Sequence, residues 1–222
     1  MNQGPWTDYL DLMWQALQET LYMVALSAVF TFAFGLALGV TLYVTGPRGV
    51  LANRYVYGLL GVIVNIGRSL PFLILLIVLI PVTRAIVGTS LGATAAIVPL
   101  TIGTSPFFSR VVETALREVD PGRIEAAQSM GATNRDIVVK VLLPEALPGL
   151  LAGATLTLVM FVDYSAMAGA IGAGGLGNFA IKYGYERFNT SLMLATVVVL
   201  VVLVQILQSS GDWVVRRVAH RR

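Results

Sequence analysis

Five long apolar stretches, separated by shorter polar segments, dominate the hydropathy pattern of the chain. They cover residues 17–44, 56–82, 91–111, 147–171 and 191–215. A transmembrane helix needs about 20 mostly apolar residues, and each stretch meets that length. Gly67, Ser69 and Pro71 interrupt the second stretch, which predicts a bend or a split there and leaves a sixth span open. The pattern predicts an all-α membrane protein, a polytopic bundle of five transmembrane helices that forms one domain over residues 1–222.

The composition agrees with a membrane location. Of the 222 residues, 56% are hydrophobic and 12% are charged, and the mean hydropathy is +0.79. A soluble domain of this size cannot enclose so much apolar sequence, so the surplus needs lipid. The chain has no cysteine, and its one histidine, His220, lies in the basic tail. We therefore expect no disulfide, no metal site and no cofactor.

The Lys and Arg residues follow a membrane topology rather than forming a patch for nucleic acid. With five spans, one side of the membrane receives Arg84, Lys182 and Arg187. The other side collects Arg48, Arg54, Arg110, Arg117, Arg123, Arg135, Lys140, Arg216, Arg217, Arg221 and Arg222. Because positively charged loops stay cytoplasmic, we expect the N-terminus outside and residues 112–146 and the C-terminus in the cytoplasm. The acidic N-terminus is unlike the basic start of a signal peptide, so the first stretch is expected to be a retained span.

The loop of residues 112–146 carries local signals for two short helices. Asp120 followed by Pro121 is typical of a helix N-terminus, and Gly131 supplies a stop. Thr133 and Asp136 have the spacing of a capping box, which opens a second helix that we expect to end at Pro144. A compact, partly apolar segment outside the membrane either packs on its own bundle or docks on another protein, and these local signals leave both open.

Several kinds of chemistry are absent from the sequence. No phosphate-binding loop of the Gly-x-x-x-x-Gly-Lys-Ser/Thr type is present, so the chain itself is not expected to hydrolyse ATP. Residues 172–177 fit Gly-x-Gly-x-x-Gly, but they follow an apolar helix rather than a strand, so we interpret them as a tight, close-packed turn. A nucleophile paired with His220 at the extreme tail is implausible for an intramembrane hydrolase. The chain is interpreted as a transport subunit and not as an enzyme.

Arg68 and Asp163 are ionisable residues that lie well inside the apolar stretches, away from their ends. Arg68 is about 12 residues into the second stretch, or roughly 18 Å at 1.5 Å per residue, where an arginine is costly. It either caps carbonyl groups freed near Ser69 and Pro71, pairs with a partner chain, or lines a transport pathway. Asp163 lies in the fourth stretch and is a candidate partner for Arg68. Gly35 with Gly39, and Gly149 with Gly153, have the small-x-x-x-small spacing of close helix packing, which we expect within the chain rather than in a dimer.

One constellation in the cytoplasmic loop is more specific. Glu125-Ala126-Ala127, followed by Gly131, Val141 and Leu143-Pro144, resembles the EAA loop of ABC importer permeases. The resemblance implies the type I importer architecture, with a coupling helix that docks into a groove on a separate ATPase subunit. The coupling residues that it implies are Glu125, Ala126, Ala127, Met130, Gly131 and Ala132.

The resemblance extends over most of the chain. Pro99-Leu100-Thr101 and residues 142–149 and 164–177 are similar to the permeases of methionine importers. This similarity implies a bacterial inner-membrane subunit that works as a homodimer with two ATPase subunits and an extracytoplasmic substrate-binding protein. Candidates for the pathway or gate are Arg68, Ser69, Pro71, Asp163, Tyr164, Ser165 and Met167. The alternatives are a permease for another amino acid or an osmolyte, and a free-standing secondary transporter, which would have no use for an EAA loop.

Overall fold

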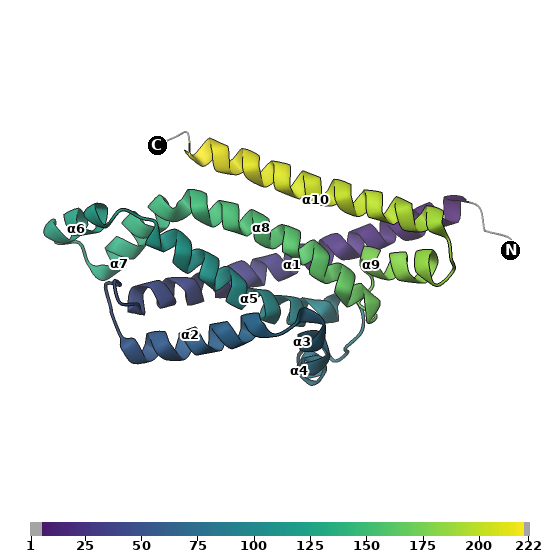
Figure 1. Ribbon diagram of the computed structural model, residues 1–222, viewed down its shortest axis with the longest axis horizontal. Helices are drawn as coiled ribbons and strands as arrows, with labels where there is room; N and C mark the ends of the chain where they lie inside the picture. Colours follow the sequence, from purple (N-terminus) through teal and green to yellow (C-terminus); the bar gives the residue numbers. More distant parts are fainter. Residues whose placement is uncertain (1–5, 220–222) are drawn as a thin grey trace. The chain divides into compact units, whose positions relative to one another are not determined.

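The structure, a computed structural model, describes residues 6–219, and every regular element within that range is helical (Figure 1). His220, Arg221 and Arg222 lie outside the described residues. The long helices are α1 (Trp6–Thr45), α2 (Arg54–Ser69), α5 (Ala93–Arg117), α8 (Leu143–Ala170) and α10 (Thr190–Ala219). The shorter elements are α3 (Phe72–Val78), α4 (Ile80–Val87), α6 (Pro121–Ser129), α7 (Asn134–Asp136), the π-helical turn η1 (Ile137–Leu142), α9 (Gly175–Phe179) and the π-helical turn η2 (Ala180–Tyr185).

Within residues 6–219 the helices provide four or five candidate spans, and the upper number equals the five that the sequence predicts. Four of them are long and apolar enough to cross a membrane: Tyr9–Thr45, Ala93–Arg117, Asn134–Ala170 and Thr190–Val218. α2 and α3, which are separated by Leu70 and Pro71, are long and apolar enough only as a pair, and they form either a fifth, broken span or a re-entrant loop. The predicted interruption of the second stretch is confirmed, because Pro71 has no N–H to continue α2 and instead precedes α3.

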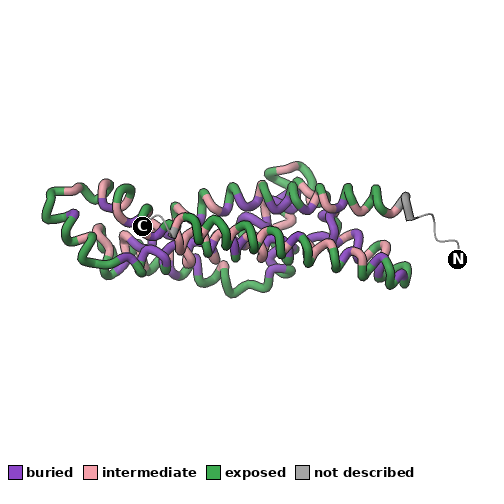
Figure 2. Tube along the Cα trace, turned by 90° about the horizontal axis from the view of Figure 1, so that it is seen from above, coloured by how far each residue is buried: buried purple, intermediate pink, exposed green. Residues whose placement is uncertain are grey.

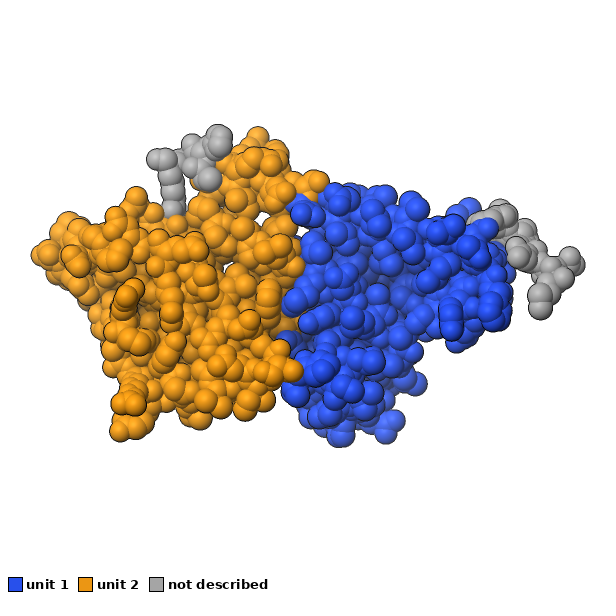
Figure 3. All heavy atoms as spheres, in the orientation of Figure 1, with its two compact units in different colours: residues 1–30, 70–103, 158–208 blue, residues 31–69, 104–157, 209–222 orange. Residues whose placement is uncertain are grey.

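Two compact units make up the chain, and each is described by itself (Figure 3). Unit 1 comprises residues 1–30, 70–103 and 158–208, and unit 2 comprises residues 31–69, 104–157 and 209–222. Buried and exposed positions are interleaved along the long helices (Figure 2). The apolar window of α10 is only 11% buried, as expected for a helix that faces lipid or a partner.

In unit 2 the other helices pack around α5 through glycine. A Cβ atom at Gly35 would lie 2.8 Å from Phe108 Cδ1, and one at Gly39 would lie 2.5 Å from the Ser109 carbonyl oxygen. Gly149 of α8 approaches Ala115 in the same way, with 3.2 Å from its hypothetical Cβ to the Ala115 Cβ. Only glycine permits such close backbone approach, so the prediction that these glycines pack within the chain is confirmed.

The core of unit 2 continues from the spans into the loop. Its buried members are Tyr43, Phe108, Val112, Ala115, Leu116, Val119, Ala127, Ile137, Leu142 and Ala146. Ile137 and Leu142 have no exposed surface, and burial of an aliphatic side chain of that size stabilises a fold by about 1.5–3 kcal/mol. The loop after α5 is therefore anchored to the helices that it connects.

Unit 1 holds a glycine-rich turn between α8 and α9. Gly172, Gly174 and Gly175 have φ values of 95°, 84° and 76°, which confirms the predicted tight turn. The Gly175 N–H donates to Glu19 Oε2 at 2.7 Å, and the Leu176 N–H donates to Thr20 Oγ1 at 2.9 Å. Side chains of α1 thereby satisfy the amide groups that open α9, and the turn is fixed against α1.

Candidate functional site

The segment between α5 and η1, residues 120–136, has the caps that its sequence predicts, and we name it the coupling segment. Asp120 Oδ1 accepts from the Gly122 N–H at 2.8 Å, with Pro121 next to the cap, and α6 follows. Gly131 has a φ of 79°, which favours glycine, and the Ala132 N–H returns to the Ala127 carbonyl at 3.1 Å. Thr133 Oγ1 accepts from the Asp136 N–H at 3.2 Å and opens α7.

One face of the coupling segment is buried and the other is open. Ala127 is 5% exposed and belongs to the core of unit 2, whereas Met130 is 82% exposed. Glu125 and Ala126 are exposed, and Ala132 is partly buried against the same core. Within residues 6–219 the Glu125 carboxylate has no hydrogen-bonding or ionic partner, so it does not hold the loop together. The loop packs on its own unit and still offers an unoccupied surface.

A second contact ties α6 to the start of α8. Arg123 forms an ion pair with Glu145, and both side chains are partly exposed. A cavity of about 320 Å³ lies beside this pair, lined by residues of α5, α6 and α8. Arg123 belongs to α6 and Glu145 belongs to α8, so the ion pair restrains α6 relative to α8.

The helix that follows the coupling segment does not end at Pro144, so that prediction was wrong. Residues 134–170 form one continuous helix, in which η1 is a π-helical turn. The Leu143 N–H donates to the Val138 carbonyl, five residues back instead of four. This shift of register lets the chain pass Pro144, which has no N–H, without breaking the helix. The coupling segment is joined to a span by a rigid rod rather than by a flexible link.

A buried charge cluster beside the coupling segment was missed by the sequence analysis. The Glu113 side chain is 3% exposed, and its carboxylate receives Arg110 Nη1 at 2.6 Å and Arg117 Nη2 at 2.5 Å. Tyr57 OH donates to Glu113 Oε1 at 3.3 Å, and Arg117 Nη2 donates to Tyr57 OH at 3.0 Å. The spacing Arg110-x-x-Glu113-x-x-x-Arg117 places all three side chains on one helical face and could have indicated the cluster.

This cluster also joins α5 to α2. Arg110 Nη2 donates to Asn65 Oδ1 at 3.0 Å and to the Gly61 carbonyl at 3.4 Å. Tyr57, Gly61 and Asn65 all belong to α2, at the spacing of successive turns. Charged and polar contacts therefore hold α2 to α5 over about two turns of α2.

The pathway candidates are divided between the two units. In unit 2, Arg68 is exposed and lines an open cavity of about 540 Å³ with Arg110 and Thr114 of α5 and with Glu118, which follows α5. Ser69 Oγ donates to the Asn65 carbonyl at 2.7 Å, within its own helix. Arg68 and Asp163 belong to different units, so their pairing stays a prediction.

The remaining pathway candidates lie in unit 1. The rings of Tyr164 and Phe72 are stacked, with centroids 4.0 Å apart and planes 8° apart, which joins α8 to α3 next to Pro71. Ser165 is buried and donates to the Val162 carbonyl at 2.7 Å, so its hydroxyl is used within the helix. Asp163 is exposed, and Met167 is 46% exposed. Pro71 is exposed as well, so Pro71, Asp163 and Met167 present side-chain surface.

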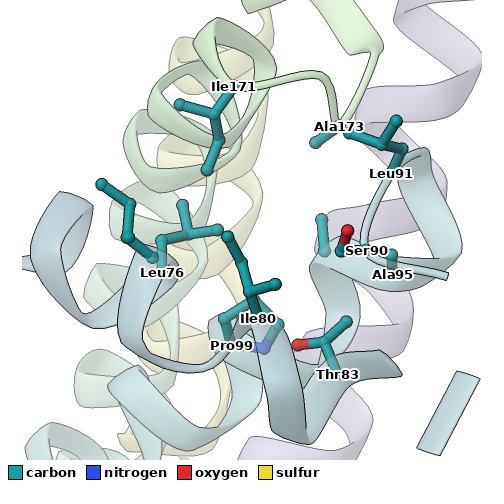
Figure 4. Close-up of a pocket in the computed structure, with 11 residues that line it drawn as sticks. Leu76, Ile80, Thr83, Ser90, Leu91, Ala95, Pro99, Ile171 and Ala173 are labelled. Atoms are coloured by element: carbon teal, nitrogen blue, oxygen red, sulfur yellow. The ribbon is translucent and has the colours of Figure 1, made fainter. Parts of the chain in front are cut away.

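A small cavity in unit 1 has a mostly apolar lining and, unlike the cavity at Arg68, no charged side chains in it (Figure 4). It measures about 120 Å³ and is lined by side chains of α3, α4, the start of α5 and the turn after α8. Thr83 and Ser90 are the polar residues of its lining, and no ionisable side chain lines it. The lining therefore offers hydroxyl groups but no side-chain charge to pair with the charged groups of an amino acid.

Known proteins resemble this chain over nearly its full length. The model for the inner membrane component of binding-protein-dependent transport systems matches residues 35–220. The probable D-methionine transport system permease protein MetI of Vibrio cholerae is 57% identical over 211 residues, which are 95% of this chain and 94% of that protein. The methionine import system permease protein MetP of Bacillus subtilis is 44% identical over 212 residues, 96% of each chain.

Solved structures agree with these sequence matches. A chain of the MetNI methionine ABC transporter, in an inward-facing conformation, has a TM-score of 0.92 and 54% identity, and the match covers 93% of this chain and 96% of that one. An amino acid ABC transporter crystallised with histidines has a TM-score of 0.73 at 19% identity over 97% of this chain and 96% of that one, which shows a shared fold. This chain belongs to the family of inner membrane components of binding-protein-dependent transport systems.

Proposed function

We propose that the chain is the membrane-spanning permease subunit of an ABC importer that carries methionine. Relatives at 57% and 44% identity over almost the whole chain are methionine permeases, and the MetNI chain shares the fold at 54% identity. The family membership supports transport with a binding protein, and the residues argue against ATP hydrolysis by the chain itself. ATP hydrolysis is assigned to a separate ATPase subunit.

The coupling segment is the observation that carries this proposal. Its buried face, through Ala127, fixes the segment to unit 2, while Glu125, Ala126 and Met130 are exposed. An exposed methionine next to small residues suits a shallow groove on a partner protein. We assign Glu125, Ala126, Ala127, Met130, Gly131 and Ala132 to the contact with the ATPase subunit.

Motion of the ATPase subunit has a physical route into the membrane. A capped helix transmits a rigid-body displacement, whereas a flexible loop would absorb it. The coupling segment ends in α7, which continues through η1 into α8 as one helix from Asn134 to Ala170. The Arg123–Glu145 ion pair connects α6 to α8 as well. The proposal is that closure of the ATPase subunits moves α8 and opens the pathway to the outside.

The proposed assembly contains two copies of this chain, two ATPase subunits and an extracytoplasmic substrate-binding protein. The distribution of Lys and Arg supports an N-terminus outside and a coupling segment and C-terminus in the cytoplasm of a bacterium. The exposed apolar face of α10 suits lipid.

For the translocation pathway we propose Arg68, Ser69 and Pro71 near the break after α2, and Asp163, Tyr164, Ser165 and Met167 in α8. The cavity at Arg68 supports this choice, because it presents Arg68 and Glu118 together and thus offers both signs of charge to a zwitterionic amino acid. Ser165 and Tyr164 contribute through packing, since their polar or aromatic groups are already engaged.

The test is retention of the ATPase subunit by purified permease. We expect Met130→Glu to reduce the amount of co-purified ATPase about tenfold, because a charge replaces an apolar side chain at the proposed contact. The matched control is Phe188→Glu, which changes a side chain that is 91% exposed in the turn before α10, on the predicted outer side. Equal retention by wild type and both variants would remove the coupling segment from the proposed contact.

A further inference from the structure

A cavity of about 500 Å³ lies at the base of the coupling segment, within unit 2. Elements that meet there are the end of α1, the turn that leads to α2, the end of α5 and the start of α6. Its lining residues are Tyr43, Gly46, Pro47, Arg48, Gly49, Tyr57, Arg117, Val119, Pro121 and Ile124. Two of them, Pro121 and Ile124, belong to α6, so any occupant of the cavity touches the coupling segment.

The lining carries an excess of positive charge. Arg48 and Arg117 line the cavity, and no acidic residue does. Arg117 shares the single Glu113 carboxylate with Arg110, so that cluster keeps one net positive charge. Arg48 is exposed and, among residues 6–219, has no acidic or hydrogen-bonding partner. The site therefore has two positive charges in excess, beside the phenol groups of Tyr43 and Tyr57.

This combination selects a ligand that is anionic at one end and apolar at the other. Guanidinium groups are good donors to phosphate oxygens, and arginine geometry matches a phosphate. Pro47, Val119 and Ile124 form an apolar wall in the same cavity. The cavity lies where the apolar stretches of α1 and α5 end, which is the level of the lipid headgroups when these helices span a bilayer.

We propose that this cavity binds the phosphate of an anionic phospholipid headgroup, with Arg48 and Arg117 as the principal contacts and the apolar wall against the glycerol region. The functional consequence, which rests on the proposed function, is that a bound lipid supports the base of the coupling segment. Basic pockets at the cytoplasmic ends of spans are suited to such headgroups because the inner leaflet is anionic.

Lipid occupancy of the purified full chain tests the proposal without any need for transport. Native mass spectrometry in detergent would compare phosphatidylglycerol with phosphatidylcholine for wild type, Arg48→Gln and Arg54→Gln. Arg54 has the same charge at the start of α2 and does not line the cavity, so it is the matched control. We expect Arg48→Gln to weaken phosphatidylglycerol binding about fivefold. Arg54→Gln should bind phosphatidylglycerol as wild type does, and the binding of phosphatidylcholine should be the same in all three proteins.

A competition with inorganic phosphate distinguishes a site for a lipid headgroup from a site for free phosphate. At millimolar concentration inorganic phosphate should leave phosphatidylglycerol bound, since it cannot use the apolar wall. Complete displacement of the lipid by phosphate, or equal lipid binding by wild type and Arg48→Gln, would each overturn the proposal. Failure of the proposed transport function would appear in the wild-type protein and would leave the lipid measurement unaffected.

Discussion

At the scale of single residues, the Glu113 carboxylate of unit 2 has three polar partners, Arg110, Arg117 and Tyr57. One carboxylate faces two guanidinium groups and a phenol, and its side chain is 3% exposed. A buried pair that keeps both partners adds little net stability, but removal of one partner strands the other charge. The Arg110 side chain is 21% exposed and the Arg117 side chain is 54% exposed. If Glu113 is removed, water can therefore solvate the charge of Arg117 far better than the charge of Arg110.

We therefore predict that Glu113→Ala lowers the stability of the permease by roughly 2–3 kcal/mol, below the full cost of an isolated buried charge because both arginines reach water in part. Glu113→Gln should lose less, since the amide oxygen still accepts from Tyr57 and an arginine. The check is the thermal midpoint of the protein in detergent. A Glu113→Ala midpoint equal to that of wild type would mean that the cluster does not stabilise the α2–α5 contact.

At the scale of helices, α6 depends on its N-cap because it is only nine residues long. Helices of that length are marginal in water without tertiary contacts. Asp120 provides one of the few contacts that open α6, and Ala127 provides the buried anchor near its other end.

Asp120→Ala should destabilise α6 by about 0.5–2 kcal/mol, because the Gly122 amide loses its acceptor, whereas Asp120→Asn keeps that acceptor and should behave almost as wild type. Hydrogen exchange of the α6 amides measures this directly, with the amides of α10 as an internal reference. Unchanged exchange in α6 of Asp120→Ala would show that tertiary packing alone holds the helix.

The same helices show what a sequence can and cannot predict. The caps at Asp120 and Thr133 and the stop at Gly131 depend on neighbours within three residues, so local rules found them. The helix through Pro144 was not predicted, because the π-helical turn η1 depends on the packing of Ile137 and Leu142 in a core that distant residues complete. The contact between Glu113 and Tyr57 was missed because 56 residues separate them. The predicted pairing of Arg68 with Asp163 stays untested.

At the scale of the whole molecule, we propose that the subunit converts motion at the coupling segment into movement of its spans. The family membership and the MetNI fold match support the importer class, and the buried and exposed faces of the coupling segment give that class a physical mechanism. The permease provides no ATP site of its own in this account, so transport must depend on its partner.

Uptake of labelled methionine into liposomes measures whether the permease imports methionine with energy from a partner ATPase. The liposomes would contain the permease with its ATPase subunit, and the binding protein would be supplied on the outer side. We predict uptake that requires ATP and the binding protein, that does not extend to an osmolyte such as glycine betaine, and that falls at least tenfold in Gly131→Asp, where the φ of 79° disfavours any side chain. Uptake of methionine that continues without ATP, or that is unaffected by Gly131→Asp, would contradict the account and would favour a free-standing transporter.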